Sequence, residues 1–166
     1  IILEEREEKW RMEIESKVFS LFADFVRDLG KTYPEIKSRL NRNYEDILTE
    51  SENRKVDDFP KLKTFLDLVY ENQSLIREKD EKLFELEIEL LEEISFKNCW
   101  SKNISVKTRG TIWKYLQLVL FSVSKDLENS DSFGDTAKLF EAIDENEFKS
   151  KMEETIEQMY DIFDMS

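Results

Sequence analysis

The sequence predicts an all-α fold, an irregular bundle of about six to eight helices around one apolar helix near residues 105–127. Helix breakers are scarce, because the 166 residues include only 3 Gly and 2 Pro. Apolar residues recur along most of the chain at spacings of three and four, the period of an amphipathic helix. In the stretch 112–123, nine of twelve residues are apolar. A helix that is apolar nearly all round is normally central in its bundle.

The first predicted helix runs from Leu3 to Leu29. Its strongly charged first turns, about residues 1–13, are expected to project into solvent as a helical extension. Gly30 suits the position just after a helix, and Pro34 prevents simple continuation. The apolar stripe of this helix consists of Trp10, Ile14, Val18, Leu21, Phe22, Phe25 and Leu29.

Two prolines mark the next helix starts, because proline is favoured in the first helical turn. The first of them opens a short helix over residues 34–40, followed by a helical turn at 44–48. A polar loop is expected over 51–58. Pro60 then opens a helix to about Glu71, with an inward face made of Leu62, Phe65, Leu66 and Val69.

A further helix is predicted over residues 78–93, where the apolar residues cover more than one stripe. Residues 94–104 form a connector with a short helical turn that carries Phe96 and Trp100. Ser105 is a suitable N-cap for the central helix, since its hydroxyl can accept a hydrogen bond from the first turn.

The C-terminal part, about residues 128–166, is predicted to be helical and acidic. It holds twelve acidic residues against three lysines. After a polar loop at 129–133, capping-box spacings at Ser132/Asp135 and Asp144/Glu147 predict the starts of two helices. The apolar stripe of the last helix is Phe148, Met152, Ile156, Met159 and Phe163. We expect one domain over 1–166, with the charged extension and this acidic segment attached.

The composition argues against an enzyme. The chain has no histidine and a single cysteine, Cys99, so Ser–His and Cys–His nucleophile pairs cannot form within it. No calcium-loop or paired-helix carboxylate motif is present. We therefore expect no catalytic residue, no metal site and no cofactor. Cys99 is expected to be a buried thiol in a reducing compartment, and no apolar run approaches the ~18 residues of a membrane span.

One segment differs in charge from the rest of this chain, whose net charge is −13. Residues 94–125 contain no acidic residue and six basic ones. Basic residues interleaved with aromatic ones fit contact with an anionic partner. The alternative is that these cations pair with the acidic C-terminal part of the same molecule. The candidate contact residues are Lys97, Trp100, Lys102, Lys107, Arg109 and Lys114.

The tryptophans fall into two groups. Trp100 and Trp113 are expected to pack in the core, as large aromatic side chains usually do. Trp10 lies in the charged first turns near the start of the chain. Trp10 either contacts a second copy or a partner, or packs in the core of its own molecule. Because of the first possibility we include it among the candidate contact residues.

Two stretches carry a resemblance. Residues 91–117 read LEEISFKNCWSKNISVKTRGTIWKYLQ, with an aromatic residue and Trp in the connector, Ile104-Ser105, a basic run and IWKYLQ. Residues 22–35 read FADFVRDLGKTYPE. Both stretches resemble, in the same order, an uncharacterised helical protein family of large nucleocytoplasmic DNA viruses, the relatives of mimiviruses and phycodnaviruses. The resemblance implies a viral origin and a helical fold, and it assigns no catalytic residue.

Together these observations predict a non-enzymatic viral protein that acts by protein–protein interaction or as a structural part of the virion or its assembly. The expected setting is the host cytoplasm or the virion, and the expected partner is another protein or a second copy. The alternative is a nucleic-acid-associated factor that uses residues 97–114, or an acidic binder of basic proteins that uses the C-terminal helix. The net charge opposes approach to nucleic acid, and no membrane partner is expected.

Overall fold

A computed structural model describes residues 2–50, 52, 55–86, 88–101, 104–124, 139–143, 148, 150–154 and 156, with side chains from residue 13 onward except at 101. The predicted loop at 129–133 and both predicted capping boxes lie outside these residues, as do Met159 and Phe163.

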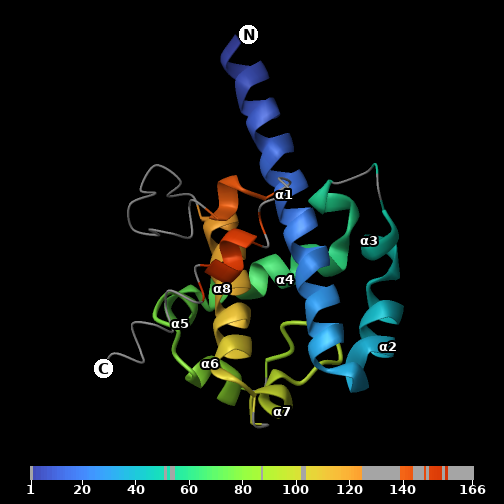
Figure 1. Cartoon of the computed structure of the whole chain (residues 1–166). Helices are drawn as coiled ribbons and strands as arrows, with labels where there is room; N and C mark the ends of the chain where they lie inside the picture. Colours follow the sequence, from blue (N-terminus) through green and yellow to red (C-terminus); the bar gives the residue numbers. More distant parts are fainter. Residues whose placement is uncertain are drawn as a thin grey trace.

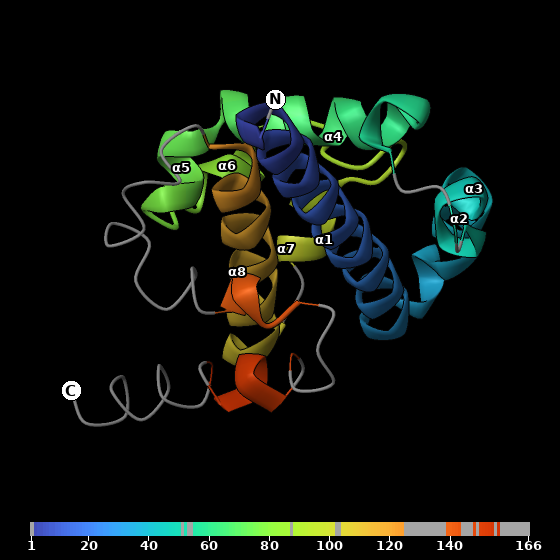
Figure 2. The same ribbon diagram turned by 90° about the horizontal axis from the view of Figure 1, so that it is seen from above.

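The chain folds as an irregular all-α bundle, as predicted. The described residues contain no β-strand and only an isolated bridge between Leu91 and Ile94. Helix α8 (Val106–Val123) lies in the middle of the bundle, and α1 (Ile2–Thr32) runs beside it (Figures 1 and 2). Ten of the 18 residues of α8 are buried, which confirms the prediction of a central helix. This helix ends at Val123, short of the predicted end near residue 127.

Helix α1 continues past the predicted end at Leu29. The backbone stays helical through Gly30 to Thr32, so Gly30 does not terminate the helix. A Cβ atom at Gly30 would lie 3.3 Å from Cγ of Lys37; the glycine therefore lets the next helix approach closely. At the other end, the first turns of α1 extend beyond the rest of the bundle (Figure 1).

The two predicted proline-started helices are confirmed. Helix α2 (Pro34–Asn43) and helix α4 (Pro60–Glu71) both have proline in their first turn. Between them lie α3 (Glu45–Thr49) and a short 3-10 helix, Val56–Asp58, within the region predicted as loop. Phe22 of α1 packs between these elements, since the centre of its ring lies 5.3 Å from that of Tyr44 and 5.0 Å from that of Phe65.

The predicted helix over 78–93 is wrong. Helix α5 (Gln73–Arg77) ends in a left-handed residue, Lys79 (φ 52°), with hydrogen bonds from Asp80 N to Leu75 O and from Lys79 N to Ile76 O. This is the Schellman pattern that closes helix C-termini, here with lysine in the place usually taken by glycine. Only α6 (Lys82–Glu85) follows as helix, and the described residues from there to Ser95, which are 86 and 88–95, are non-helical.

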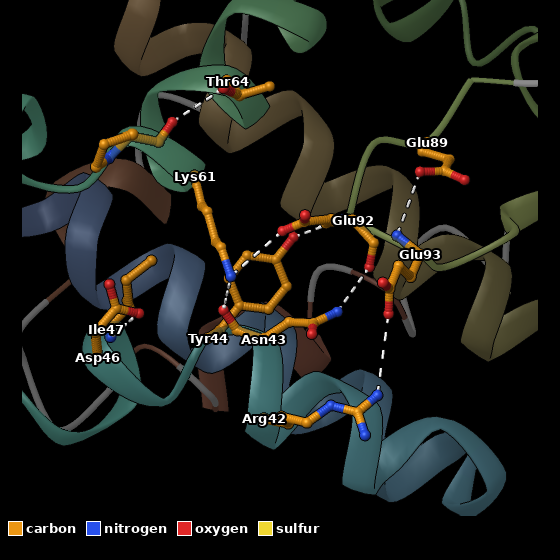
Figure 3. Close-up of polar contacts among 11 residues, drawn as sticks. Arg42, Asn43, Tyr44, Asp46, Ile47, Lys61, Thr64, Glu89, Glu92 and Glu93 are labelled. Atoms are coloured by element: carbon orange, nitrogen blue, oxygen red, sulfur yellow. Dashed lines mark hydrogen bonds and ion pairs between the residues drawn. The ribbon is translucent and has the colours of Figure 1, made fainter.

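The non-helical residues 88–95 are held in place by polar contacts with Asn43, Tyr44 and Lys61 (Figure 3). Tyr44 Oη accepts a hydrogen bond from Glu92 N (2.8 Å), and Asn43 Nδ2 donates to Glu92 O (3.0 Å). Lys61 pairs with the Glu92 carboxylate at 3.3 Å. Leu90, Leu91 and Ile94 are buried. The polar contacts and the buried side chains together hold this part of the chain in a bent, non-helical course.

Helix α7 (Phe96–Ser101) confirms the helical turn predicted in the connector. Ser105 caps α8 as predicted, because its Oγ accepts a hydrogen bond from Thr108 N (3.1 Å). The described C-terminal residues also pack on this helix. The Phe140 ring lies 5.0 Å from Phe121, and a Cβ atom at Gly110 would lie 3.6 Å from Ile156. The buried residues of this segment are Leu139, Phe140, Ala142, Ile143, Phe148, Met152 and Ile156.

Candidate binding surface at the basic end of the bundle

Trp100 is a packing residue, as predicted. Its ring is 9% exposed and stacks on Phe84 at 4.0 Å between centroids, while Trp113 meets it edge-on at 5.7 Å. The guanidinium carbon of Arg109 lies 5.4 Å from the centre of the Trp100 ring. Because Trp100 is buried, with Phe84 stacked on its ring and Arg109 close by, it offers little surface to an external aromatic group. Trp113, 6% exposed, is also buried as predicted, and so is Cys99.

Arg109 has a partner within the molecule. Its Nη1 lies 3.5 Å from Oε1 of Glu81, which directly precedes α6. The basic segment therefore pairs within the molecule at Arg109. The partner, Glu81, lies in the middle of the chain and not in the acidic C-terminal part where the sequence suggested it. The side chains of Arg109 and Glu81 are 39% and 59% exposed, so their ion pair contributes at most about 1 kcal/mol to stability.

Three of the other predicted contact residues cannot be placed on the exposed surface: one is buried, and the side chains of two are not described. Lys114 is only 7% exposed, so it is too deep to meet an external anion in this structure, and we remove it from the surface. Its place on α8 explains this, because α8 is enclosed on nearly all sides. Lys102 lies outside the described residues, and Trp10 belongs to α1 at a position whose side chain is not described.

Lys97 and Lys107 remain as exposed cations. Lys97 lies on α7 and Lys107 in the first turn of α8. In the part of the chain that the structure describes, no carboxylate lies within ion-pair distance of either ammonium group. Val106, the residue before Lys107, is 58% exposed. The first turn of α8 thus presents a cation beside an apolar side chain.

Two further lysines lie at the same end of the bundle. The end of α1, the start of α2, α7 and the start of α8 meet there, at the lower end of Figure 1, and Tyr33 Oη donates to the carbonyl of Cys99 (3.4 Å) across the junction. Lys31 and Lys37 are exposed at this junction, and no described residue pairs with them. We call Lys31, Lys37, Lys97 and Lys107 the basic end. No signal in the sequence connects Lys31 and Lys37 with Lys97, because only the fold brings α1 and α2 to α7.

A pocket of about 140 Å³ opens between α1 and α8 at the basic end. Phe25, Leu29 and Ile112 give it an apolar floor, and Lys107 lies on its rim. Asp28 and Tyr115 line its wall, where Tyr115 Oη donates a hydrogen bond to the Asp28 carboxylate. Burial raises the pKa of Tyr115 well above its usual range, and the bond to Asp28 adds to this rise. Tyr115 is therefore the neutral donor of this pair at all ordinary pH values.

A second pocket, of about 320 Å³, lies beside Tyr44, Lys61 and Glu92 (Figure 3). Two of its charged groups, Lys61 and Glu92, pair with one another. Lys61 Nζ donates to the carbonyl of Asn43 at 2.8 Å besides pairing with Glu92 at 3.3 Å, and it lies 5.9 Å from the centre of the Tyr44 ring. Burial raises the pKa of Tyr44 to about 12. These contacts hold residues 88–95 in place, so this pocket belongs to the scaffold of the fold.

The described residues contain no group of three or more acidic or thiol side chains that could hold a metal ion. None of the helices in the described part of the chain is long and apolar enough to cross a membrane.

No protein-family model, curated protein or solved structure matches the chain.

Proposed function

We propose that this protein is a non-enzymatic interaction protein whose basic end docks an acidic segment of a protein partner. The observation that carries the proposal is the pair Lys97 and Lys107, exposed and without a described carboxylate partner. Acidic residues outnumber basic ones by 38 to 25 in this chain, so internal partners are plentiful. Cations that nevertheless lie at one end of the bundle with no carboxylate partner among the described residues suit an external anion, which they would attract and orient.

An acidic protein segment suits this end better than nucleic acid does. Proteins that bind single strands offer aromatic faces on which bases stack, but Phe84 and Arg109 already occupy Trp100. A duplex carries one negative charge per about 1.7 Å of its axis. Repulsion by a chain of net charge −13 therefore opposes a duplex far more than a short segment with a few carboxylates.

The setting belongs to the proposal as well. The resemblance of residues 22–35 and 91–117 to a family of large DNA viruses implies a partner within the virion or the infected cell. A second copy could also supply the acidic segment, since residues 128–166 hold twelve acids against three lysines. In that case the protein would associate with itself, and its light-scattering mass would rise with concentration and fall with added salt.

The test is a fluorescence anisotropy titration with three labelled probes: a glutamate-rich peptide, a lysine-rich peptide and a short DNA duplex. The wild type should bind the glutamate-rich peptide. The variant Lys97→Glu/Lys107→Glu should bind this peptide at least about tenfold more weakly, which is a loss of ~1.4 kcal/mol or more in binding free energy. Lys63→Glu is the matched control, because Lys63 is an exposed lysine of α4 that already pairs with Asp57 at 3.5 Å.

Each other pattern points to a different class of partner. Salt-dependent binding of the duplex, lost in Lys97→Glu/Lys107→Glu, would replace the proposal with a nucleic-acid-associated role. Binding of the lysine-rich peptide alone would make the protein an acidic binder of basic proteins. An equal loss in the Lys63→Glu control would refute a specific role for the basic end.

A further inference from the structure

The pocket between α1 and α8 has the size of one small ring. Its volume of about 140 Å³ is close to the roughly 150 Å³ of a protein cavity that holds a benzene molecule. Phe25, Leu29 and Ile112 supply an apolar floor, and all three are buried, at 0%, 4% and 2% exposure. An aromatic ring seated there would remove apolar surface from water on both sides of the contact.

Apart from Lys107 on the rim and Thr108, whose hydroxyl shares a hydrogen bond with Ser105 Oγ, the polar side chains of this pocket present acceptors, because their donors are already used. Thr32 Oγ1 donates to the carbonyl of Asp28 (2.8 Å), and Thr111 Oγ1 donates to the carbonyl of Lys107 (2.9 Å). Tyr115 Oη donates to the Asp28 carboxylate. Lone pairs of these oxygens remain free to accept from a ligand. A ligand that fills the pocket should therefore carry a hydrogen-bond donor.

The surrounding charges restrict this donor to a neutral group. An ammonium or guanidinium would have to approach past Lys107 on the rim and the other lysines of the basic end. A carboxylate inside the pocket would meet Asp28 on the wall. An uncharged hydroxyl on an aromatic ring meets neither obstacle, and its O–H can donate to Asp28 or to a threonine oxygen.

We infer that this pocket binds the phenol side chain of a tyrosine carried by the acidic segment that docks at the basic end, an inference that rests on the proposed function. The ring lies on Phe25, Leu29 and Ile112, and its hydroxyl donates to the wall of the pocket. Carboxylates that flank the tyrosine then reach Lys107 and Lys31. A buried aromatic anchor inside a charged rim is the usual anatomy of a protein interface.

The test compares three glutamate-rich peptides that differ only in a central Tyr, Phe or Ala. The Tyr peptide should bind about tenfold more tightly than the Ala peptide, with the Phe peptide between them because it leaves the acceptors unpaired. Thr111→Leu, which fills the pocket and removes one acceptor, should bring the Tyr peptide down to the level of the Ala peptide. Thr64→Leu on α4 is the matched control and should change nothing, because Thr64 Oγ1 also donates only to its own helix (3.0 Å).

A second measurement separates this inference from the proposed function. Free p-cresol, followed by protein NMR, should perturb the signals of residues 28, 111 and 115 more strongly than toluene does. Equal binding of the Tyr and Ala peptides, with no p-cresol effect, would overturn the pocket inference and leave the docking of acidic segments intact. A p-cresol effect that Thr111→Leu abolishes, without binding of any acidic peptide, would support the phenol site and overturn the proposed function.

Discussion

Tyr115 of α8 donates a hydrogen bond to the carboxylate of Asp28 of α1, across 87 positions in the sequence. This bond joins the central helix to its longest neighbour, at the wall of the pocket between them. Tyr115 is 1% exposed, so the bond is sheltered from water on its donor side. Fold and candidate site thus depend on the same pair of side chains.

Tyr115→Phe should destabilise the protein by about 1–3 kcal/mol, because it leaves the Asp28 carboxylate without its donor in a half-buried position. Urea unfolding followed by circular dichroism measures the change. Asp28→Asn is the companion variant, since its amide oxygen can still accept from Tyr115. We expect it to lose less than Tyr115→Phe. The opposite order would mean that the negative charge of Asp28, and not the hydrogen bond, dominates.

Stability should fall steeply at alkaline pH. Burial raises the pKa of Tyr33 and of Tyr44 to about 12 from 10.0, and it also raises that of Tyr115. A phenol whose pKa is higher in the folded state contributes stability that is complete below pH 10, the unfolded value. This contribution is lost as pH rises from 10 toward the folded value near 12.

Unfolding free energies measured between pH 8 and pH 12, together with tyrosinate absorbance, would check the alkaline loss. Tyr44→Phe should lessen the slope above pH 10 while lowering stability at neutral pH, because the Glu92 amide loses its acceptor. A stability profile that stays flat to pH 12 would contradict the burial of these phenols.

Glu93→Gly should stabilise the protein by about 1 kcal/mol, because Glu93 has a φ of 64°, a conformation that costs a non-glycine residue about that much. The carbonyl that accepts from Arg39 (3.1 Å) is retained. The side chain gives up only an exposed pair with Arg42 at 4.0 Å, which contributes little. Thermal unfolding of Glu93→Gly, with Arg42→Ala as control for the lost pair, measures the gain. Destabilisation beyond that of Arg42→Ala would rule out the left-handed turn.

Gly110→Ala should also raise stability, by about 0.5–1 kcal/mol, because alanine is the better residue within a helix. The new Cβ would lie 3.6 Å from Ile156, an ordinary contact distance, so it adds packing without a clash. Calorimetry of Gly110→Ala and of the bulkier Gly110→Leu would separate the two effects. We expect the leucine variant to lose stability, since it would push residue 156 away from α8. If leucine were tolerated as well as alanine, the C-terminal segment could not pack at Gly110.

The central helix and its neighbours were predictable because their signals are local. Nine apolar residues in twelve mark α8, and prolines mark the starts of α2 and α4. The helix expected over 78–93 failed for the opposite reason. Its chain is bent by left-handed turns at Lys79 and Glu93, neither of which is glycine. Part of what holds it lies 48 positions away, at Tyr44.

The candidate site was likewise predictable only where its signal lies within one segment of the sequence. The acid-free segment identified Lys97 and Lys107, which the structure leaves exposed. It also suggested Lys114, which the enclosed central helix buries. Lys31, Lys37 and the Asp28–Tyr115 pair come from elements that only the tertiary fold brings together. No periodicity or spacing in one segment signals such a meeting.

The most direct test of docking at the basic end is to map the contact on isotope-labelled protein by NMR, as the glutamate-rich peptide with a central tyrosine is added. We expect amide shift changes that cluster at residues 28–37, 97–100 and 106–115 and that vanish in Lys97→Glu/Lys107→Glu. Changes that cluster instead around Tyr44 and Lys61, or along the first turns of α1, would contradict docking at the basic end.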